Sequence, residues 1–75
     1  MKHGYGVYKW ADGSQYEGYY LNGARNGEGY MVYANGDEYD GEWMDGVKHG
    51  RGKFISKTQN ITGVWKKGKL IELIT

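Results

Sequence analysis

The fold of this chain follows from one stretch of sequence, Gly36-Asp37-Glu38-Tyr39-Asp40-Gly41-Glu42-Trp43-Met44-Asp45-Gly46. The same order of glycine, tyrosine, acid, glycine and aromatic residue occurs 23 positions earlier, over residues 13–23. A weaker copy occurs 22 positions later, over residues 61–68. A period of about 20 to 50 residues is typical of proteins built from stacked repeats. We therefore interpret the chain as a repeat protein with units at about 3–25, 26–48 and 49–70, followed by a cap or edge segment at 70–75.

The composition indicates a single small domain, residues 1–75. The chain has 75 residues with 14 Gly, no Pro and no Cys, and its aromatic residues are eight Tyr, three Trp and one Phe. Without cysteine there is no disulfide framework and no thiolate metal site. No apolar run approaches the roughly 20 residues of a membrane-spanning helix, and Met1-Lys2-His3-Gly4 begins no signal peptide. We therefore expect a cytoplasmic protein, either free or held peripherally at a membrane or cytoskeletal structure.

Each repeat predicts a β-hairpin. The first repeat alternates large and small residues on both sides of Asp12-Gly13, a pair that favours hairpin turns because it tolerates positive φ. The second repeat turns at Asn35-Gly36. The third turns near Thr58-Gln59 and lacks such a pair, so its hairpin should be the least regular. We interpret Leu21-Asn22-Gly23 as a break that leads from one unit to the next.

The fold prediction is therefore all-β. We expect six strands in three consecutive hairpins, paired antiparallel in one elongated, twisted, open sheet with almost no helix. The last apolar run, Leu70-Ile71-Glu72-Leu73-Ile74, fits either a closing strand or one turn of helix, and its length does not decide between them.

Four segments carry a resemblance to a known family: residues 3–6, 16–20, 39–46 and 48–52. Together they resemble the MORN (membrane occupation and recognition nexus) repeat, whose unit reads approximately Y-x-G-x-W-x-x-G-x-x-H-G-x-G. The resemblance covers residues 3–69, with two close copies and a partial third. It implies a row of hairpins with a groove lined by the repeated aromatic rings. Members of this family act as membrane-apposition and scaffold modules, bind partner segments, sometimes self-associate, and accompany lipid kinases and methyltransferases as non-catalytic parts.

The repeated aromatic residues are the candidate partner-binding groove. In the first two repeats a glycine separates two large rings on one face, which lets the rings lie over bare backbone. A one-layer sheet of this size cannot hide all of these rings. They either pack mainly on one another or leave an exposed remainder that binds a protein partner segment, and the two interpretations are compatible. The predicted groove residues are Tyr8, Trp10, Tyr16, Tyr20, Tyr33, Tyr39, Trp43 and Trp65.

Charge is divided unevenly along the chain. Residues 1–47 hold three basic and eight acidic residues, a net charge of −5, whereas residues 48–75 hold seven basic and one acidic, a net charge of +6. The basic half is either a solvated face or a weak site for anionic lipid, worth roughly 1 kcal/mol per basic residue near the surface. The candidate lipid-binding residues are Lys48, Arg51, Lys53, Lys66, Lys67 and Lys69. We expect no nucleic-acid partner, because the overall charge is only +1.

Self-association is a further expectation. A linear sheet leaves an unpaired strand at each end, and open edges promote pairing between chains. Contact could run head-to-tail between the oppositely charged ends or through the apolar C-terminal segment 70–75, and we favour the C-terminal contact.

Catalysis has little support in the sequence. His3 and His49 occupy the same repeat position, which indicates a shared turn role, and the carboxylates Glu17, Asp40 and Glu42 also follow the repeat. We expect no enzyme activity, no cofactor and no metal site. The predicted function is a non-catalytic scaffold or adaptor module for protein–protein interaction, with peripheral binding to anionic lipid as an additional option. The alternatives are a carbohydrate- or choline-binding aromatic repeat, or the accessory domain of a larger enzyme such as a lipid kinase or methyltransferase.

Overall fold

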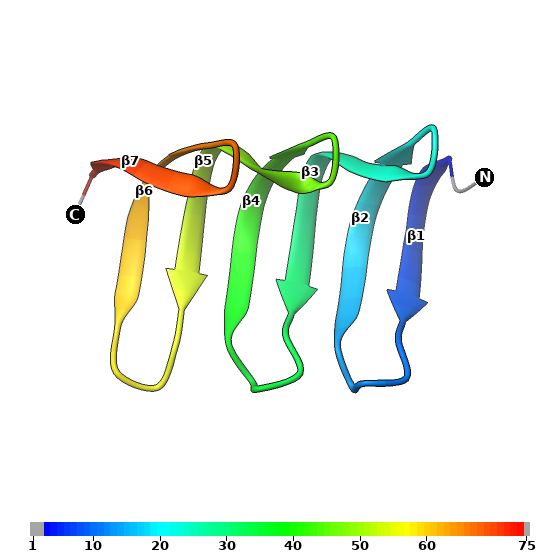
Figure 1. The fold of residues 1–75 in the computed structure, drawn as a ribbon, viewed down its shortest axis with the longest axis horizontal. Coiled ribbons are helices and arrows are strands. Elements are labelled where there is room, and N and C mark those ends of the chain that lie inside the picture. The colour runs from blue at the N-terminus through cyan, green and yellow to red at the C-terminus, as the bar shows by residue number, and fades with distance from the viewer. Residues whose placement is uncertain (1–2, 75) are drawn as a thin grey trace.

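The computed structural model describes residues 3–74 as one antiparallel sheet of seven strands, measuring 35 × 23 × 15 Å (Figure 1). Each strand pairs with its neighbours in sequence, so the strand order is β1 to β7 without a crossover. The described residues form no helix. The strands are β1 (Gly4–Lys9), β2 (Gln15–Leu21), β3 (Ala24–Val32), β4 (Glu38–Met44), β5 (Val47–Ile55), β6 (Asn60–Lys66) and β7 (Lys69–Leu73).

The predicted hairpin turns form at the lower ends of the strands in Figure 1. At the first turn, the Asp12 carboxylate accepts hydrogen bonds from the backbone N–H and the hydroxyl of Ser14, at 2.9 and 2.6 Å. Gly13 follows with φ of 97°. The third turn has no glycine and is closed instead by Ser56 N–H donating to Gln59 O at 2.8 Å. The turn chemistry thus follows the expectation from sequence.

A second set of turns joins the units, at the point where the sequence indicated that one strand ends and the chain leads to the next unit. The pairs Asn22-Gly23, Asp45-Gly46 and Lys67-Gly68 all have positive φ at both positions. This is the type I′ geometry of a two-residue hairpin, which matches the right-handed twist of the flanking strands. The chain is therefore a continuous series of hairpins in which long and tight turns alternate.

The structure has seven strands, one more than the six expected in the three hairpins. Residues 69–73 form β7, which pairs antiparallel with β6, so the apolar C-terminal run is a closing strand and not a helical turn. The tight turn at Lys67-Gly68 reverses the chain and makes this pairing possible. Thr75, the last residue of the expected cap segment, lies outside the described residues.

The sheet bends near its upper margin. Pairing shifts register between Gly18 and Tyr20, and again between Gly41 and Trp43. Irregularities of this kind bend a strand and increase its twist. The tight turns consequently fold over the upper ends of the strands (Figure 1), and we call the row of three turns the ledge. Each later ledge turn is tied to the preceding repeat, because Gly46 N–H donates to Arg25 O and Gly68 N–H to Lys48 O, both at 2.9 Å.

A row of glycines crosses the sheet at mid-height. Register places Gly6, Gly18, Gly29, Gly41, Gly52 and Gly63 side by side on six successive strands. A Cβ atom on Gly18 would approach the Gly29 Cα to 2.5 Å, and a Cβ on Gly29 would overlap the Tyr16 ring. The expectation that rings lie over bare backbone is confirmed.

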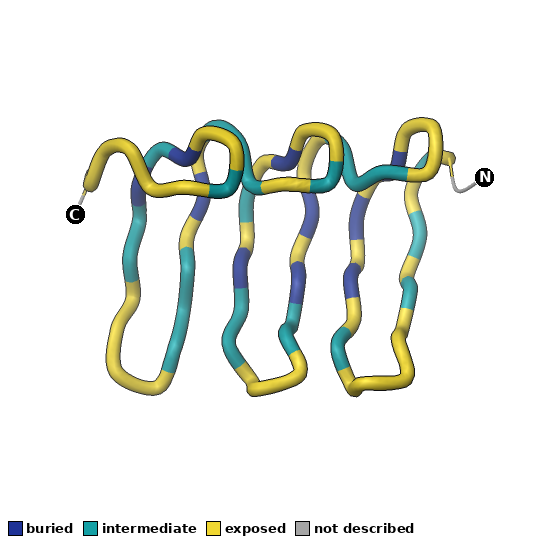
Figure 2. Tube along the Cα trace, viewed as in Figure 1, coloured by how far each residue is buried: buried dark blue, intermediate teal, exposed yellow. Residues whose placement is uncertain are grey.

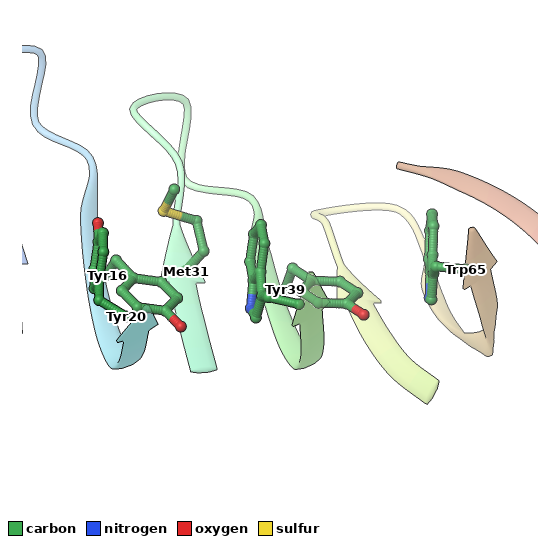
Figure 3. Packing of buried hydrophobic residues seen from close by; sticks show 6 residues of the cluster. Tyr16, Tyr20, Met31, Tyr39 and Trp65 are labelled. Carbon is green, nitrogen blue, oxygen red and sulfur yellow. The ribbon is translucent and has the colours of Figure 1, made fainter. Parts of the chain in front are cut away.

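The core is a row of side chains on one face of the sheet. Figure 2 shows the buried positions interrupting exposed ones along the strands, and Figure 3 shows the side chains following one another from β2 to β6. Neighbouring rings meet edge to face, with Tyr39 and Trp43 centroids 5.1 Å apart at 85°. Such pairs contribute about 0.5–1.5 kcal/mol beyond the area that they bury. The buried hydrophobic residues are Tyr16, Tyr20, Met31, Tyr39, Trp43 and Trp65.

Candidate functional site: the aromatic face

All eight predicted groove residues belong to the aromatic face, the side of the sheet that carries the buried row, but they are not equally accessible. Five are buried: Tyr16, Tyr20, Tyr39, Trp43 and Trp65. Tyr8 and Tyr33 pack against this row and are only partly buried, and Trp10 keeps 37% of its surface exposed. The structure thus divides the predicted groove into a buried floor and an accessible rim. Phe54, which the sequence reasoning did not select, packs against the floor beside Tyr33 and completes the rim.

Polar groups on the floor rings are satisfied inside the sheet. The indole N–H of Trp43 donates to Gly29 O, and that of Trp65 donates to Gly52 O, both at 3.1 Å. The Tyr16 hydroxyl donates to Tyr19 O, and the Tyr39 hydroxyl to Glu42 O, both at 3.0 Å. Burial raises the pKa of Tyr16 to about 12 and also raises the pKa of Tyr39. These hydroxyls therefore stay protonated near neutral pH and act as fixed structural donors.

Two cations lie against the floor rings at equivalent repeat positions. The guanidinium carbon of Arg25 is 4.8 Å from the Trp43 ring centroid, and the Lys48 ammonium nitrogen is 4.7 Å from the Trp65 ring centroid. Arg25 is further held by a 2.7 Å hydrogen bond from its Nη2 to Gly46 O. Burial lowers the pKa of Lys48 below its ordinary value.

Sequence reasoning missed Arg25 and assigned Lys48 to a lipid site. The signal was present, because each cation stands two residues after the glycine of a tight turn and the two are 23 residues apart.

A cavity of about 300 Å³ opens where the ledge meets the aromatic face. It adjoins the N-terminal end of the floor, where Tyr20 lies. Its lining residues are Trp10, Tyr20, Gly23, Ala24, Arg25 and Gly46. A hollow that combines aromatic walls with a cation suits a partner group that has an apolar body and a negative end.

The six candidate lipid-binding residues do not form one cluster. Lys48 lies on the aromatic face, whereas Arg51 and Lys53 alternate to the opposite face of the same strand. The other three surround the last ledge turn: Lys66 ends β6, Lys67 is in the turn and Lys69 begins β7. Only this last group is contiguous.

The opposite face carries a second aromatic feature that the sequence reasoning also missed. Tyr5, Tyr19 and Tyr30 are exposed there, and together with carboxylates they line an open cavity of about 420 Å³. The Tyr5 hydroxyl donates to Glu17 at 2.7 Å, and the Tyr30 hydroxyl donates to Glu38 at 2.5 Å. The Glu38 hydrogen bond raises the pKa of Tyr30 to about 12. Alternation along the strands, which places these residues opposite the core row, was the available signal.

The described residues offer no metal cluster and no spanning helix. Across residues 3–74, no three His, Cys, Asp or Glu side chains converge in a way that could hold a metal ion. Within that range no helix is long and apolar enough to cross a membrane.

Comparison with known proteins identifies the repeat. The family described as MORN repeat matches three consecutive segments, residues 1–15, 16–38 and 39–61. The matched segments start at other residues than the repeat units expected from the sequence, 3–25, 26–48 and 49–70. Two of the matched segments are 23 residues long, which equals the repeat offset found in the sequence. No curated protein matches the chain.

Proposed function

The chain belongs to the MORN repeat family, and we propose that it is a non-catalytic adaptor module that binds a partner protein segment along its aromatic face. Repeats of this family are generally protein or lipid interaction modules and are typically non-catalytic. The finer assignment, to one face and one class of partner, is our proposal. We also propose that the protein works in the cytoplasm.

One observation carries this proposal: a rim of accessible rings stands over a floor that is already packed. Tyr8, Tyr33 and Phe54 are only partly buried, and Trp10 borders the cavity at the ledge. Large apolar patches left accessible on a protein usually mark interaction sites. Aromatic residues are also the groups most enriched where binding energy concentrates.

The two sets of rings then have separate roles. The floor rings stabilise the sheet, because they are buried and their polar atoms are satisfied internally. The rim rings contact the partner. Truncation of a floor ring should therefore lower stability first, and truncation of a rim ring should weaken binding while the protein stays folded.

A peptide selection tests the proposal. A displayed library of peptides is selected against the folded chain, and each binder is titrated against a rim variant, Tyr33→Ser, and an opposite-face variant, Tyr19→Ser. We expect binders to lose about tenfold or more in affinity on the rim variant, since an interface hot spot costs at least about 2 kcal/mol when truncated. The opposite-face variant should bind like the parent. The reverse pattern would assign the partner to the other face and reject the proposal.

A second candidate function, peripheral contact with anionic lipid, is favoured by the C-terminal end of the sheet. Lys66, Lys67 and Lys69 surround the last ledge turn, and the adjoining Leu70 and Ile71 are 40% and 59% exposed. Basic and apolar groups together are what a weak interfacial contact requires. Flotation with phosphatidylserine vesicles, comparing the parent with Lys66→Glu/Lys67→Glu, tests this: the variant should lose binding. Equal flotation of both proteins would exclude this end as the contact.

A further inference from the structure

We propose that the partner segment is an acidic amphipathic helix that places two carboxylates, seven residues apart, on Arg25 and Lys48. This inference rests on the proposed function and specifies the chemistry of its partner. Four features of the structure carry it: charge segregation between the two faces, the unpaired state of the two cations, the distance between their strands, and the apolar rim beside them.

Charge on the sheet is segregated by face. From β1 to β6, alternation sends the acidic residues of the strands, Glu17, Glu28, Glu38, Asp40 and Glu42, to the face opposite the core row. Among the described residues of these strands, the charged side chains on the aromatic face are Arg25 and Lys48. A partner lying on this face therefore meets positive charge only, and like-signed groups on the partner would be repelled.

Neither cation is neutralised within the described chain. Arg25 and Lys48 make no ion pair with any carboxylate of residues 3–74, and their contacts are with rings and with the Gly46 carbonyl oxygen. A carboxylate is the protein group that matches a guanidinium most closely.

The distance between the two positions selects a helix over an extended segment. Arg25 is on β3 and Lys48 on β5, so they are two strand spacings apart, about 9.6 Å. Seven residues of α-helix rise about 10.5 Å and return to nearly the same side of the helix. In an extended segment, residues on the same side are about 6.6 Å apart at a spacing of two residues and about 13 Å apart at a spacing of four. Neither spacing matches the separation of about 9.6 Å between the positions of Arg25 and Lys48. A helix crossing the strands therefore brings both carboxylates into register.

The rim supplies the complementary apolar surface. Tyr33 and Phe54 lie 6.4 Å apart between centroids and adjoin Lys48, whose ammonium nitrogen is 5.2 Å from the Phe54 ring centroid. An apolar stripe on the helix would pack against these rings, while the acidic positions beside the stripe face the two cations. Partner binding by an amphipathic helix laid in a groove is one of the recurrent modes of peptide recognition.

The experiment uses a library of 21-residue helical peptides with a fixed apolar stripe and with Glu, Gln or Lys allowed at the flanking positions. We expect selection against the folded chain to enrich Glu at two positions seven residues apart. Changing both to Gln should weaken binding about tenfold or more, because each exchange replaces a charge-assisted hydrogen bond with a weaker neutral one.

A matched pair of protein variants localises the effect. Lys48→Met and Lys53→Met remove the same charge from the same strand on opposite faces. The Glu-over-Gln preference should shrink with Lys48→Met and persist with Lys53→Met. Peptides with Lys in place of Glu should bind a Lys48→Glu protein better than they bind the parent, provided that circular dichroism shows the variant folded.

The outcomes separate the two proposals. If Glu is not enriched, or if the Gln peptides bind the parent equally well while Tyr33→Ser still abolishes binding, the acidic-helix inference fails and the aromatic face remains the partner surface. If binding ignores Tyr33→Ser, the proposed function fails as well. If phosphatidylserine vesicles bind through Lys48 and no peptide is selected, the partner is lipid and the inference is overturned.

Discussion

Replacing Trp43 with alanine should remove a large part of the free energy of unfolding, because this side chain is the centre of the floor. Trp43 is 5% exposed, meets Tyr16 and Tyr39 edge to face at 5.6 and 5.1 Å, and donates to Gly29 O. Truncating a buried Trp costs about 3–5 kcal/mol. A chain of 75 residues has a total stability of roughly 4–11 kcal/mol at 0.05–0.15 kcal/mol per residue. The substitution therefore removes between about a quarter and all of the stability.

Urea unfolding followed by far-ultraviolet circular dichroism measures this loss without using the fluorescence that the substitution removes. Trp10→Ala is the matched control, since Trp10 is the same residue type, on the same face, with 37% of its surface exposed. We expect the control to cost about 1 kcal/mol or less, as substitutions away from the core usually do. Equal losses for the two variants would refute the division of the aromatic face into a structural floor and an accessible rim.

Three further predictions follow from local features. Lys67→Asn should stabilise the chain by a few tenths of a kcal/mol to about 1 kcal/mol, because Asn adopts the φ of 51° at this position more readily than Lys. Thermal unfolding measures the change, and a lower unfolding midpoint for the variant would contradict the prediction. The free energy of unfolding should fall as pH rises from about 10 toward 12, because burial raises the folded-state pKa of Tyr16 to about 12 and the unfolded chain loses this proton at lower pH. Urea titrations across this pH range should show a shallower fall for Tyr16→Phe than for the parent. Leu73 is 62% exposed on the edge strand β7 and should promote self-association. Sedimentation should show that Leu73→Asp shifts the chain toward monomer, and an unchanged distribution of oligomers would argue against the C-terminal contact.

The sequence predicted the features that depend on local pattern. The repeat offset and the turn residues at Asp12-Gly13 and Asn35-Gly36 fixed the units, and alternation placed the aromatic rings on one face. It also predicted that glycine would separate the rings, which the overlap between Gly29 and the Tyr16 ring explains. These inferences succeeded because turns and alternation are set by residues near one another in the chain.

Other features depended on contacts between repeats and were missed. The sequence indicated that a strand ends at Asn22-Gly23, but it did not indicate a two-residue hairpin turn there, which the positive φ values of both residues show. Which rings are buried depends on neighbouring strands: Tyr16 is covered by Trp43 from the next repeat, whereas Trp10 lies at the margin. The same is true of Arg25, which lies over the Trp43 ring of the next repeat.

A nuclear magnetic resonance titration of the folded chain with a peptide from the helical library shows directly which face of the sheet binds the partner. We expect the largest changes at the Trp10 indole, at Tyr33 and at the side chains of Arg25 and Lys48, with little change at Tyr19 on the opposite face. Changes concentrated at Tyr19, with Arg25 and Lys48 unaffected, would contradict the claim that the aromatic face and its two cations bind the partner.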